Sequence, residues 1–252
     1  MASSSTRPPG DRHIRLALRA ANKAKKPIAF VVAGHNGSGK STLWYERLAD
    51  RLQIPLINAD RLITSILPID ADSGRLRKWA RKLRDKDERW QRLAQSGVQA
   101  FVGLTMAQNM PFAFETVFSH WTKRADGGYD SKADMIVEFQ KAGFFVVLLF
   151  VGLTSAELSI LRVHTRQQQG GHGVPTAKLR ERFPRTQLAI RHAATIADRT
   201  LMFDNSRDPS KAFSLARVQK GKQVLYDCRR DPAEKQLRKV AAHWLQHVAP
   251  EY

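Results

Sequence analysis

The chain has 252 residues, of which 42% are hydrophobic and 26% charged, with 15 glycines and 11 prolines, a composition that excludes a collagen-like, low-complexity or disordered protein. A formal net charge of +19 predicts an anionic partner: a nucleic acid, an acidic membrane or protein surface, or a phosphate-rich small substrate. The single cysteine, Cys228, excludes an internal disulfide framework and is typical of a reducing compartment such as the cytoplasm.

The elements alternate regularly after a basic N-terminal segment. Residues 1–26 begin with serine, proline and glycine and continue into a short basic helix, and we expect the first ten residues to be flexible. From residue 27 onward, apolar runs alternate with helical patterns. The expected strands span residues 28–33, 54–58, 112–118, 144–151 and 200–203, and the expected helices span residues 41–52, 74–107, 132–142, 155–168 and 176–198.

This alternation predicts a three-layer α/β/α fold with a mainly parallel five-stranded sheet. The run at residues 144–151 is apolar on successive residues, as in a strand that is covered on both faces. Extended to residue 153, it reaches about half of a membrane span, so we expect no membrane-spanning segment, and we also expect no secretory leader. After residue 208 the pattern weakens, and we expect a hairpin near residues 217–225 and a helix over residues 233–248.

The strongest motif lies between the first expected strand and the first expected helix. It matches the phosphate-loop pattern G-x-x-x-x-G-K-[ST], whose main-chain amides surround a phosphate group. Lys40 would bridge the β- and γ-phosphates of a nucleoside triphosphate, and the Ser41 hydroxyl would ligate Mg²⁺. The alternative is a glycine-rich turn that binds nothing. The residues expected to bind the nucleotide here are Gly34, His35, Asn36, Gly37, Ser38, Gly39, Lys40, Ser41 and Thr42.

Two carboxylates follow or lie within neighbouring strands. Asp60 comes directly after the second strand, where it could accept the proton of an acceptor hydroxyl or could cap the helix that begins at Arg61. Glu115 lies inside the apolar third strand, where an unpaired charge is costly. It could contact Mg²⁺ indirectly, bind the acceptor, or form a buried pair with an arginine.

An arginine-rich segment over residues 162–185 is interpreted as a lid. Arg162 and Arg166 share a helix face, Arg182 returns on the next helix, and the glycine-rich stretch between them could act as a hinge. Guanidinium groups that close over a transferring phosphoryl group would stabilise its charge, although each one could also be an ordinary solvated residue. His172 in this stretch is expected to make a local hydrogen bond.

Residues 75–90 are expected to form one helix with its basic residues facing outward. Those basic residues are either a solvated face or an electropositive wall for an anionic substrate or an acidic partner. The residues expected to pack on its inner face are Leu76, Trp79, Leu83 and Trp90.

The order of these motifs resembles the zeta-toxin family of P-loop kinases over about residues 27–206. The resemblance depends on the phosphate loop, Asn58-Ala-Asp60, Phe114-Glu115-Thr116, the segments 162–175 and 182–185, Ala197-Asp198 and Phe203-Asp-Asn205-Ser206. One departure is Thr116-Val-Phe-Ser119-His120, where longer zeta toxins have a Gly-x-Gly-Arg stretch.

The resemblance implies an ATP- or GTP-dependent kinase that requires Mg²⁺ and is restrained by an antitoxin. Known members phosphorylate UDP-N-acetylglucosamine, which is therefore the first candidate acceptor. Carried over by position, Lys40 and Ser41 match the nucleotide and Mg²⁺ positions, and Asp60 matches the catalytic base. Glu115 matches the acidic residue of the third strand, and Asn205 matches a position near the nucleotide base.

Two function classes remain open. The first is a kinase with Lys40, Asp60, Glu115 and the arginines 162, 166 and 182 in catalytic roles, and it includes an acidic antitoxin as a possible partner. The second is a nucleic-acid-associated P-loop NTPase or polynucleotide kinase, which the charge of +19 suggests. The expected organisation is a basic segment over residues 1–26, a P-loop kinase domain over residues 27–208, and a C-terminal extension over residues 209–252 that packs on that domain.

Overall fold

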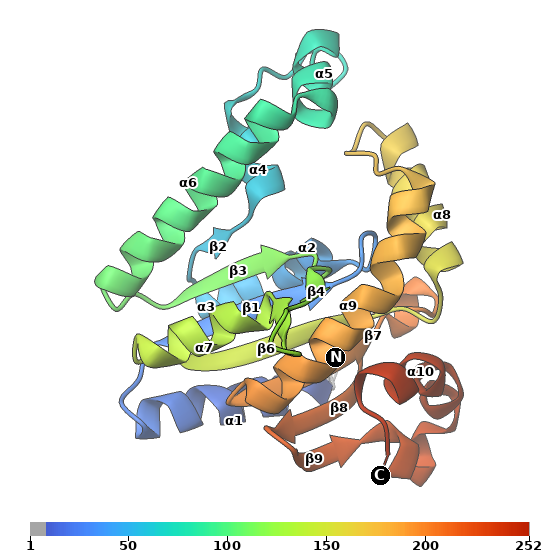
Figure 1. Ribbon diagram of the computed structural model, residues 1–252. Coiled ribbons are helices and arrows are strands. Elements are labelled where there is room, and N and C mark those ends of the chain that lie inside the picture. The colour runs from blue at the N-terminus through green and yellow to red at the C-terminus, as the bar shows by residue number, and fades with distance from the viewer. Residues whose placement is uncertain (1–8, 252) are drawn as a thin grey trace, which may run out of the picture.

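The computed structural model describes residues 9–251. Of the first ten residues, which were expected to be flexible, 1–8 lie outside the described part, whereas residues 9 and 10 begin a helix. The centre of the structure is a mainly parallel sheet with helices on both faces, which confirms the predicted fold class (Figure 1). In spatial order the strands are β2 (Leu56–Ile57), β3 (Phe112–Thr116), β1 (Ile28–Gly34), β6 (Phe145–Gly152), β7 (Arg199–Asp204), β8 (Ser214–Lys220) and β9 (Gln223–Asp227).

The first five strands in this order are parallel, as expected, and the C-terminal hairpin of β8 and β9 adds two antiparallel strands to the same sheet. The register places Val32 of β1 opposite Glu115 of β3, and Ala33 opposite Thr116. The carboxyl ends of β1 and β3 are therefore level, and the polar residues that follow them meet at one edge.

The two faces of the sheet have separate helical layers. One layer contains α1 (Pro9–Lys23), α2 (Lys40–Leu43), a π-helical turn at Trp44–Leu48, and α3 (Ala49–Leu52). The other contains α6 (Glu88–Ala107), α7 (Ala133–Lys141), α9 (Thr176–Ile196) and α10 (Lys235–Val248). The strands between them are buried on both faces, which explains why β6 has no polar residue along its length.

Two helical arms rise above the carboxyl ends of the strands (Figure 1). One consists of α4 (Ala59–Ile66), α5 (Lys78–Lys86) and α6, and the other consists of α8 (Ala156–Gln168) and the first half of α9. No helix within residues 9–251 is both long enough and apolar enough to cross a bilayer.

Two local expectations were wrong, and one element was missed. The single helix expected over residues 75–90 is two helices, because the Asp87 side chain accepts hydrogen bonds from the amides of Arg89 and Trp90 and so starts α6. Trp79, expected to be packed, is 55% exposed, and Ala80 takes the buried position beside it. A short hairpin of β4 (Trp121–Lys123) and β5 (Tyr129–Ser131) was not foreseen.

Candidate functional site

The phosphate-loop sequence forms a tight turn between β1 and α2. The Lys40 side chain is only 7% exposed, and its ammonium group donates hydrogen bonds to the carbonyl oxygens of Gly34 and His35, at 3.2 and 3.0 Å. Gly37 and Gly39 have φ angles of +68° and +93°, which residues with a Cβ rarely adopt. A Cβ on Gly39 would also lie 2.6 Å from the amide nitrogen of Asn205, so the turn requires glycine there.

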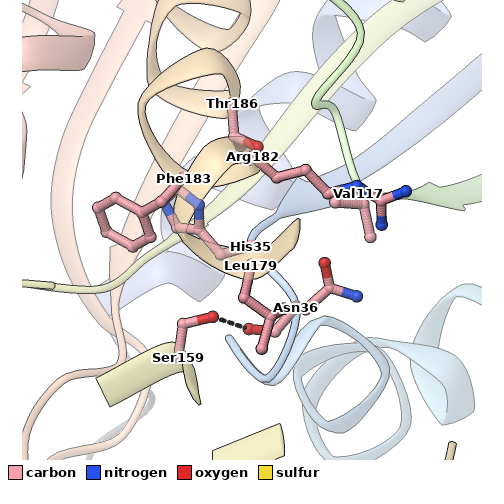
Figure 2. A pocket seen from close by; sticks show the side chains of 8 residues that line it. All are labelled: His35, Asn36, Val117, Ser159, Leu179, Arg182, Phe183 and Thr186. Carbon is pink, nitrogen blue, oxygen red and sulfur yellow. Dashed lines mark hydrogen bonds between the residues drawn. The ribbon is translucent and has the colours of Figure 1, made fainter. Parts of the chain in front are cut away.

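Two side chains from other parts of the chain hold the loop in this shape. The Asn205 side chain, after β7, donates to the Ser38 carbonyl oxygen at 2.8 Å. The Ser159 hydroxyl, on α8, donates to the Asn36 carbonyl oxygen at 2.7 Å (Figure 2). Asn205 was predicted to lie near the nucleotide base, and in the structure its amide nitrogen is directed at the loop itself.

His35 contacts α9 rather than the interior of the loop. Its ring stacks on the Phe183 ring, with centroids 3.9 Å apart (Figure 2). It also packs edge-on against Phe150, with ring centroids 5.9 Å apart. The side chain is 2% exposed, and neither ring nitrogen has a hydrogen-bond partner within residues 9–251. Burial, and secondarily the charge of Lys40, lowers the pKa of His35 to about 3, so the ring is neutral at physiological pH.

Ser41 and Glu115 form the part of the site that could bind a metal. The Ser41 hydroxyl lies 2.9 Å from each carboxylate oxygen of Glu115, which is partly buried and forms no ion pair with an arginine in the described residues. A hydroxyl and a carboxylate beside a phosphate loop are the oxygen ligands that Mg²⁺ prefers. Residues 9–251 contain no cluster of three or more His, Cys, Asp or Glu that could hold a metal by itself.

Asp60 is not the cap of its helix, and so that alternative was wrong. The cap of α4 is Asn58, whose side-chain oxygen accepts from the Arg61 amide at 3.1 Å. The Asp60 carboxylate is exposed on the first turn, and no hydrogen bond or ion pair to it is found in the described part of the chain. It is therefore free to accept a proton from a ligand.

The charged residues of the site lie close enough to affect one another. Burial lowers the pKa of Lys40, Glu115 opposes this shift, Arg166 adds to it, and Asp60 opposes it. Four of the predicted catalytic residues, from α2, α4, β3 and α8, thus interact electrostatically at the carboxyl end of the sheet. Such convergence from separate elements is typical of an active site in an open α/β fold.

The other two predicted arginines flank this group. Arg162 lies on α8, where the turn at Gly37 packs against its Cβ. Burial lowers its pKa, and Asp204 partly opposes that effect. Arg182 lies on α9 and lines the same hollow as His35, Asn36 and Val117 (Figure 2). Burial also lowers its pKa, followed by the charge of Arg185.

Lys132, which sequence reasoning did not select, belongs to the same region. It lies immediately before α7, and its ammonium group donates a short hydrogen bond to the Thr116 hydroxyl at the end of β3. Burial lowers its pKa to about 8, and the charges of Arg182 and Lys40 contribute. A lysine at the start of a predicted helix is common and gives no signal in the sequence. Its place in the site depends on the preceding hairpin, which brings the residue back to β3.

The two arms contact each other at their tips. His172 Nδ1 lies 2.8 Å from a carboxylate oxygen of Asp85, and both terminal nitrogens of Arg84 donate to the Gly170 carbonyl oxygen at 3.3 Å. Arg84 also pairs with Asp85 at 2.7 Å. His172 was expected to make a local hydrogen bond, whereas its partner is 87 residues away. We call these four residues the tip contact.

A family model described as Zeta toxin matches residues 14–231, which is most of the chain. Among curated proteins, none matches this sequence.

Solved structures with similar folds include chains from two different systems. The chain is similar to one from the PezAT chromosomal toxin–antitoxin system of Streptococcus pneumoniae, with a TM-score of 0.51 and 13% identity over 95% of this chain and 88% of that chain. It is also similar to a chain of the AvrRxo1-ORF1:-ORF2 complex with ATP, with a TM-score of 0.56 and 12% identity over 95% of this chain and 72% of that chain. At these identities the likeness shows a shared fold.

Proposed function

The chain belongs to the zeta toxin family, and we propose that it is a Mg²⁺-dependent kinase that transfers the γ-phosphoryl group of ATP or GTP to a hydroxyl of a small nucleotide-type metabolite. The observation that carries this proposal is the Asp60 carboxylate, which is exposed, not engaged in capping, and within electrostatic range of Lys40. A phosphate loop alone would fit any nucleotide hydrolase. Phosphoryl transfer to an alcohol also needs a base, and a carboxylate without another partner near the loop could serve as one.

In the proposed reaction, the acceptor oxygen attacks the γ-phosphorus while the bond between that phosphorus and the β–γ bridging oxygen breaks. Asp60 takes the hydroxyl proton, and the nucleoside diphosphate leaves with the bond electrons. Lys40 would turn from the Gly34 and His35 carbonyl oxygens to the phosphates, and the arginines 162, 166 and 182 would stabilise the transferring group. Mg²⁺, held by Ser41 and indirectly by Glu115, would neutralise phosphate charge.

Several observations support the acceptor and the nucleotide. The family membership makes UDP-N-acetylglucosamine the first candidate acceptor. The structure of the AvrRxo1-ORF1:-ORF2 complex with ATP supports ATP as the phosphoryl donor on this fold. The net charge of +19 also favours a substrate that carries several phosphates.

The test measures acceptor-dependent formation of nucleoside diphosphate. Purified protein with Mg²⁺ and ATP or GTP is offered UDP-sugars, dinucleotides and 5′-hydroxyl oligonucleotides, and products are identified by mass spectrometry. Asp60→Asn is expected to lower kcat by about 10²–10⁴-fold, whereas Asp50→Asn, an exposed carboxylate on α3, should behave like the parent. Equal activity of Asp60→Asn and the parent would contradict the proposal. Turnover stimulated only by oligonucleotides would establish the polynucleotide alternative instead.

We also propose an acidic, antitoxin-like protein as a partner. The similarity to a chain of the PezAT toxin–antitoxin system supports this, as does the large positive charge. Co-expression with the product of a neighbouring gene that encodes an acidic chain, followed by size-exclusion chromatography, tests it. A stable complex that inhibits turnover is expected, and two separately eluting proteins would contradict it.

A further inference from the structure

Two cationic side chains from different helices gather at the carboxyl end of β3. Lys132, before α7, contacts the Thr116 hydroxyl, and Arg182, on α9, extends toward Val117, the next residue of the chain (Figure 2). The charges of Arg182 and Lys40 both lower the pKa of Lys132, so the three cations face a common region.

The pleat of β3 explains why Lys132 reaches this place from the other side of the sheet. Successive side chains of a strand point to opposite faces, so Glu115 faces Ser41 of α2 while Thr116 faces α7. The phosphate loop is therefore approached by α2 and Glu115 on one face and by Lys132 and Arg182 on the other.

Lys132 and Arg182 lack the counter-ions that other buried cations in the described residues possess. Arg84 pairs with Asp85 at 2.7 Å, and Arg229 pairs with Asp227 at 2.7 Å. No ion pair within residues 9–251 includes Lys132, and Arg182 has only the electrostatic influence of Glu181 on its own helix. Partly buried cations without an acid are costly unless an anionic ligand compensates them.

We propose that Lys132 and Arg182 form a phosphate-binding site at the end of β3, a role that rests on the proposed function for its setting. The ammonium group supplies a compact charge and the guanidinium group supplies paired N–H donors, a combination suited to the non-bridging oxygens of a phosphate. The phosphate is either the terminal phosphate of the nucleotide or a phosphate group of the acceptor. Both sources present the same chemistry, and the experiment below separates them.

The test uses three variants of the full chain. Lys132→Met removes the charge and keeps the length of the side chain, and Lys132→Arg restores a cation. Lys141→Met, at the exposed far end of α7, is the matched control. Isothermal titration calorimetry measures the affinity for Mg-ADP, for the Mg complex of a non-hydrolysable ATP analogue with an imido β–γ bridge, and for inorganic phosphate added to protein already saturated with that analogue.

Loss of a charged hydrogen bond to phosphate is expected to weaken binding about 10–100-fold. If the nucleotide supplies the phosphate, Lys132→Met lowers the affinity for the ATP analogue by that factor and leaves the affinity for ADP unchanged. If the acceptor supplies it, both nucleotides bind as in the parent, and inorganic phosphate binding to the loaded protein is lost. Partial recovery in Lys132→Arg is expected in either case.

The proposal is overturned if Lys132→Met, with a parent-like circular dichroism spectrum, binds all three probes as the parent does. Thr116→Val is a fourth variant that keeps the charge of Lys132 but removes the hydroxyl that positions it, and a smaller loss of the same affinity is expected. A parent that binds no nucleotide would contradict the proposed function. Inorganic phosphate titrated into nucleotide-free protein would then still test Lys132, and equal affinities of parent and Lys132→Met would overturn its role.

Discussion

His35 of the phosphate loop stacks on Phe183 of α9, with ring centroids 3.9 Å apart and ring planes at 12°. This contact connects the loop that would hold the nucleotide to the helix that carries Arg182, one residue earlier in the chain. Because the ring pair is buried, movement of the first half of α9 away from the loop would expose both rings to water. The geometry of the loop and the position of the lid are thereby coupled.

Phe183→Ala is expected to loosen the phosphate loop. Loss of the buried ring should lower the free energy of unfolding by about 3 kcal/mol and speed amide hydrogen exchange at residues 35–39. Leu188→Ala, on the same helix but 43% exposed, should change neither quantity appreciably. Urea unfolding and hydrogen-exchange mass spectrometry measure the two effects, and unchanged exchange in the loop would contradict the coupling.

His35 is expected to make the protein sensitive to acid. Its pKa is about 3 in the folded state against an ordinary 6.5, so below pH 6.5 the unfolded chain binds a proton that the folded chain excludes. The contribution of the neutral His35 ring to the free energy of unfolding is therefore complete above pH 6.5. It is lost as the pH falls toward 3, at up to about 1.4 kcal/mol per pH unit. The charged group that acts on the ring is Lys40, while Phe150 and Phe183 surround it.

His35→Phe keeps a ring between the two phenylalanines and cannot be protonated. Its free energy of unfolding should fall less steeply than that of the parent between pH 6.5 and 4.5, whereas exposed His120→Gln should follow the parent. If the free energy of unfolding had the same pH dependence in His35→Phe and in the parent, the His35 ring would be protonated in the folded protein.

Lys132→Met is expected to stabilise the protein without ligands. The pKa of Lys132 is lowered to about 8 from 10.5. At pH 7 the folded protein therefore carries a charge on Lys132 that burial and the charges of Arg182 and Lys40 make unfavourable. Within residues 9–251 the ammonium group has one hydrogen-bond partner, the Thr116 hydroxyl. Removing that charge should raise the free energy of unfolding on the order of 1–3 kcal/mol at pH 7. The parent gains stability as the pH rises from 8 to 10.5, because its unfolded state binds more protons, so the difference should shrink at pH 9.5. A variant that is less stable than the parent at both pH values would contradict this.

Glu115→Gln is expected to weaken Mg²⁺ binding rather than nucleotide binding itself. The amide can still accept from Ser41, but it lacks the charge that would orient a hydrated cation. The Mg²⁺ concentration for half-maximal turnover should rise about 10–100-fold, and affinity for nucleotide in EDTA should stay near the parent value. Exposed Glu138→Gln on α7 is the control. An unchanged Mg²⁺ requirement would remove Glu115 from the metal site.

Asp85→Asn is expected to open the tip contact. Burial works to raise the pKa of Asp85, but hydrogen bonds from Arg84 and His172 outweigh it and lower the pKa, so the carboxylate is charged and bound at neutral pH. Without that charge, amide exchange over residues 169–175 should be roughly 10-fold faster. Exposed Asp72→Asn should leave it unchanged. If amide exchange over residues 169–175 were the same in both variants, the two arms would be held together by contacts other than the tip contact.

Much of this protein follows from local patterns. The phosphate loop is contiguous, and its glycines are required by backbone geometry over a few residues, so residues 34–42 could be recognised directly. The five parallel strands were found because each is a short apolar run between helical patterns. Asp60 and Glu115 could be selected because a charge directly after or inside an apolar strand is unusual.

The remaining features depend on contacts between distant segments, which no local pattern encodes. The expected helix over residues 75–90 ends at Asp87, because the Asp87 side chain caps a new helix there. The regular spacing of basic residues across this position gave no sign of the break. His35 and Phe183, Lys132 and Thr116, and His172 and Asp85 meet only because the parallel sheet brings the carboxyl ends of its strands, and the helices around them, to one edge. The sequence determined the chemistry of the loop, and the tertiary structure decided which cations, rings and carboxylates surround it, because burial and proximity are properties of the packed chain.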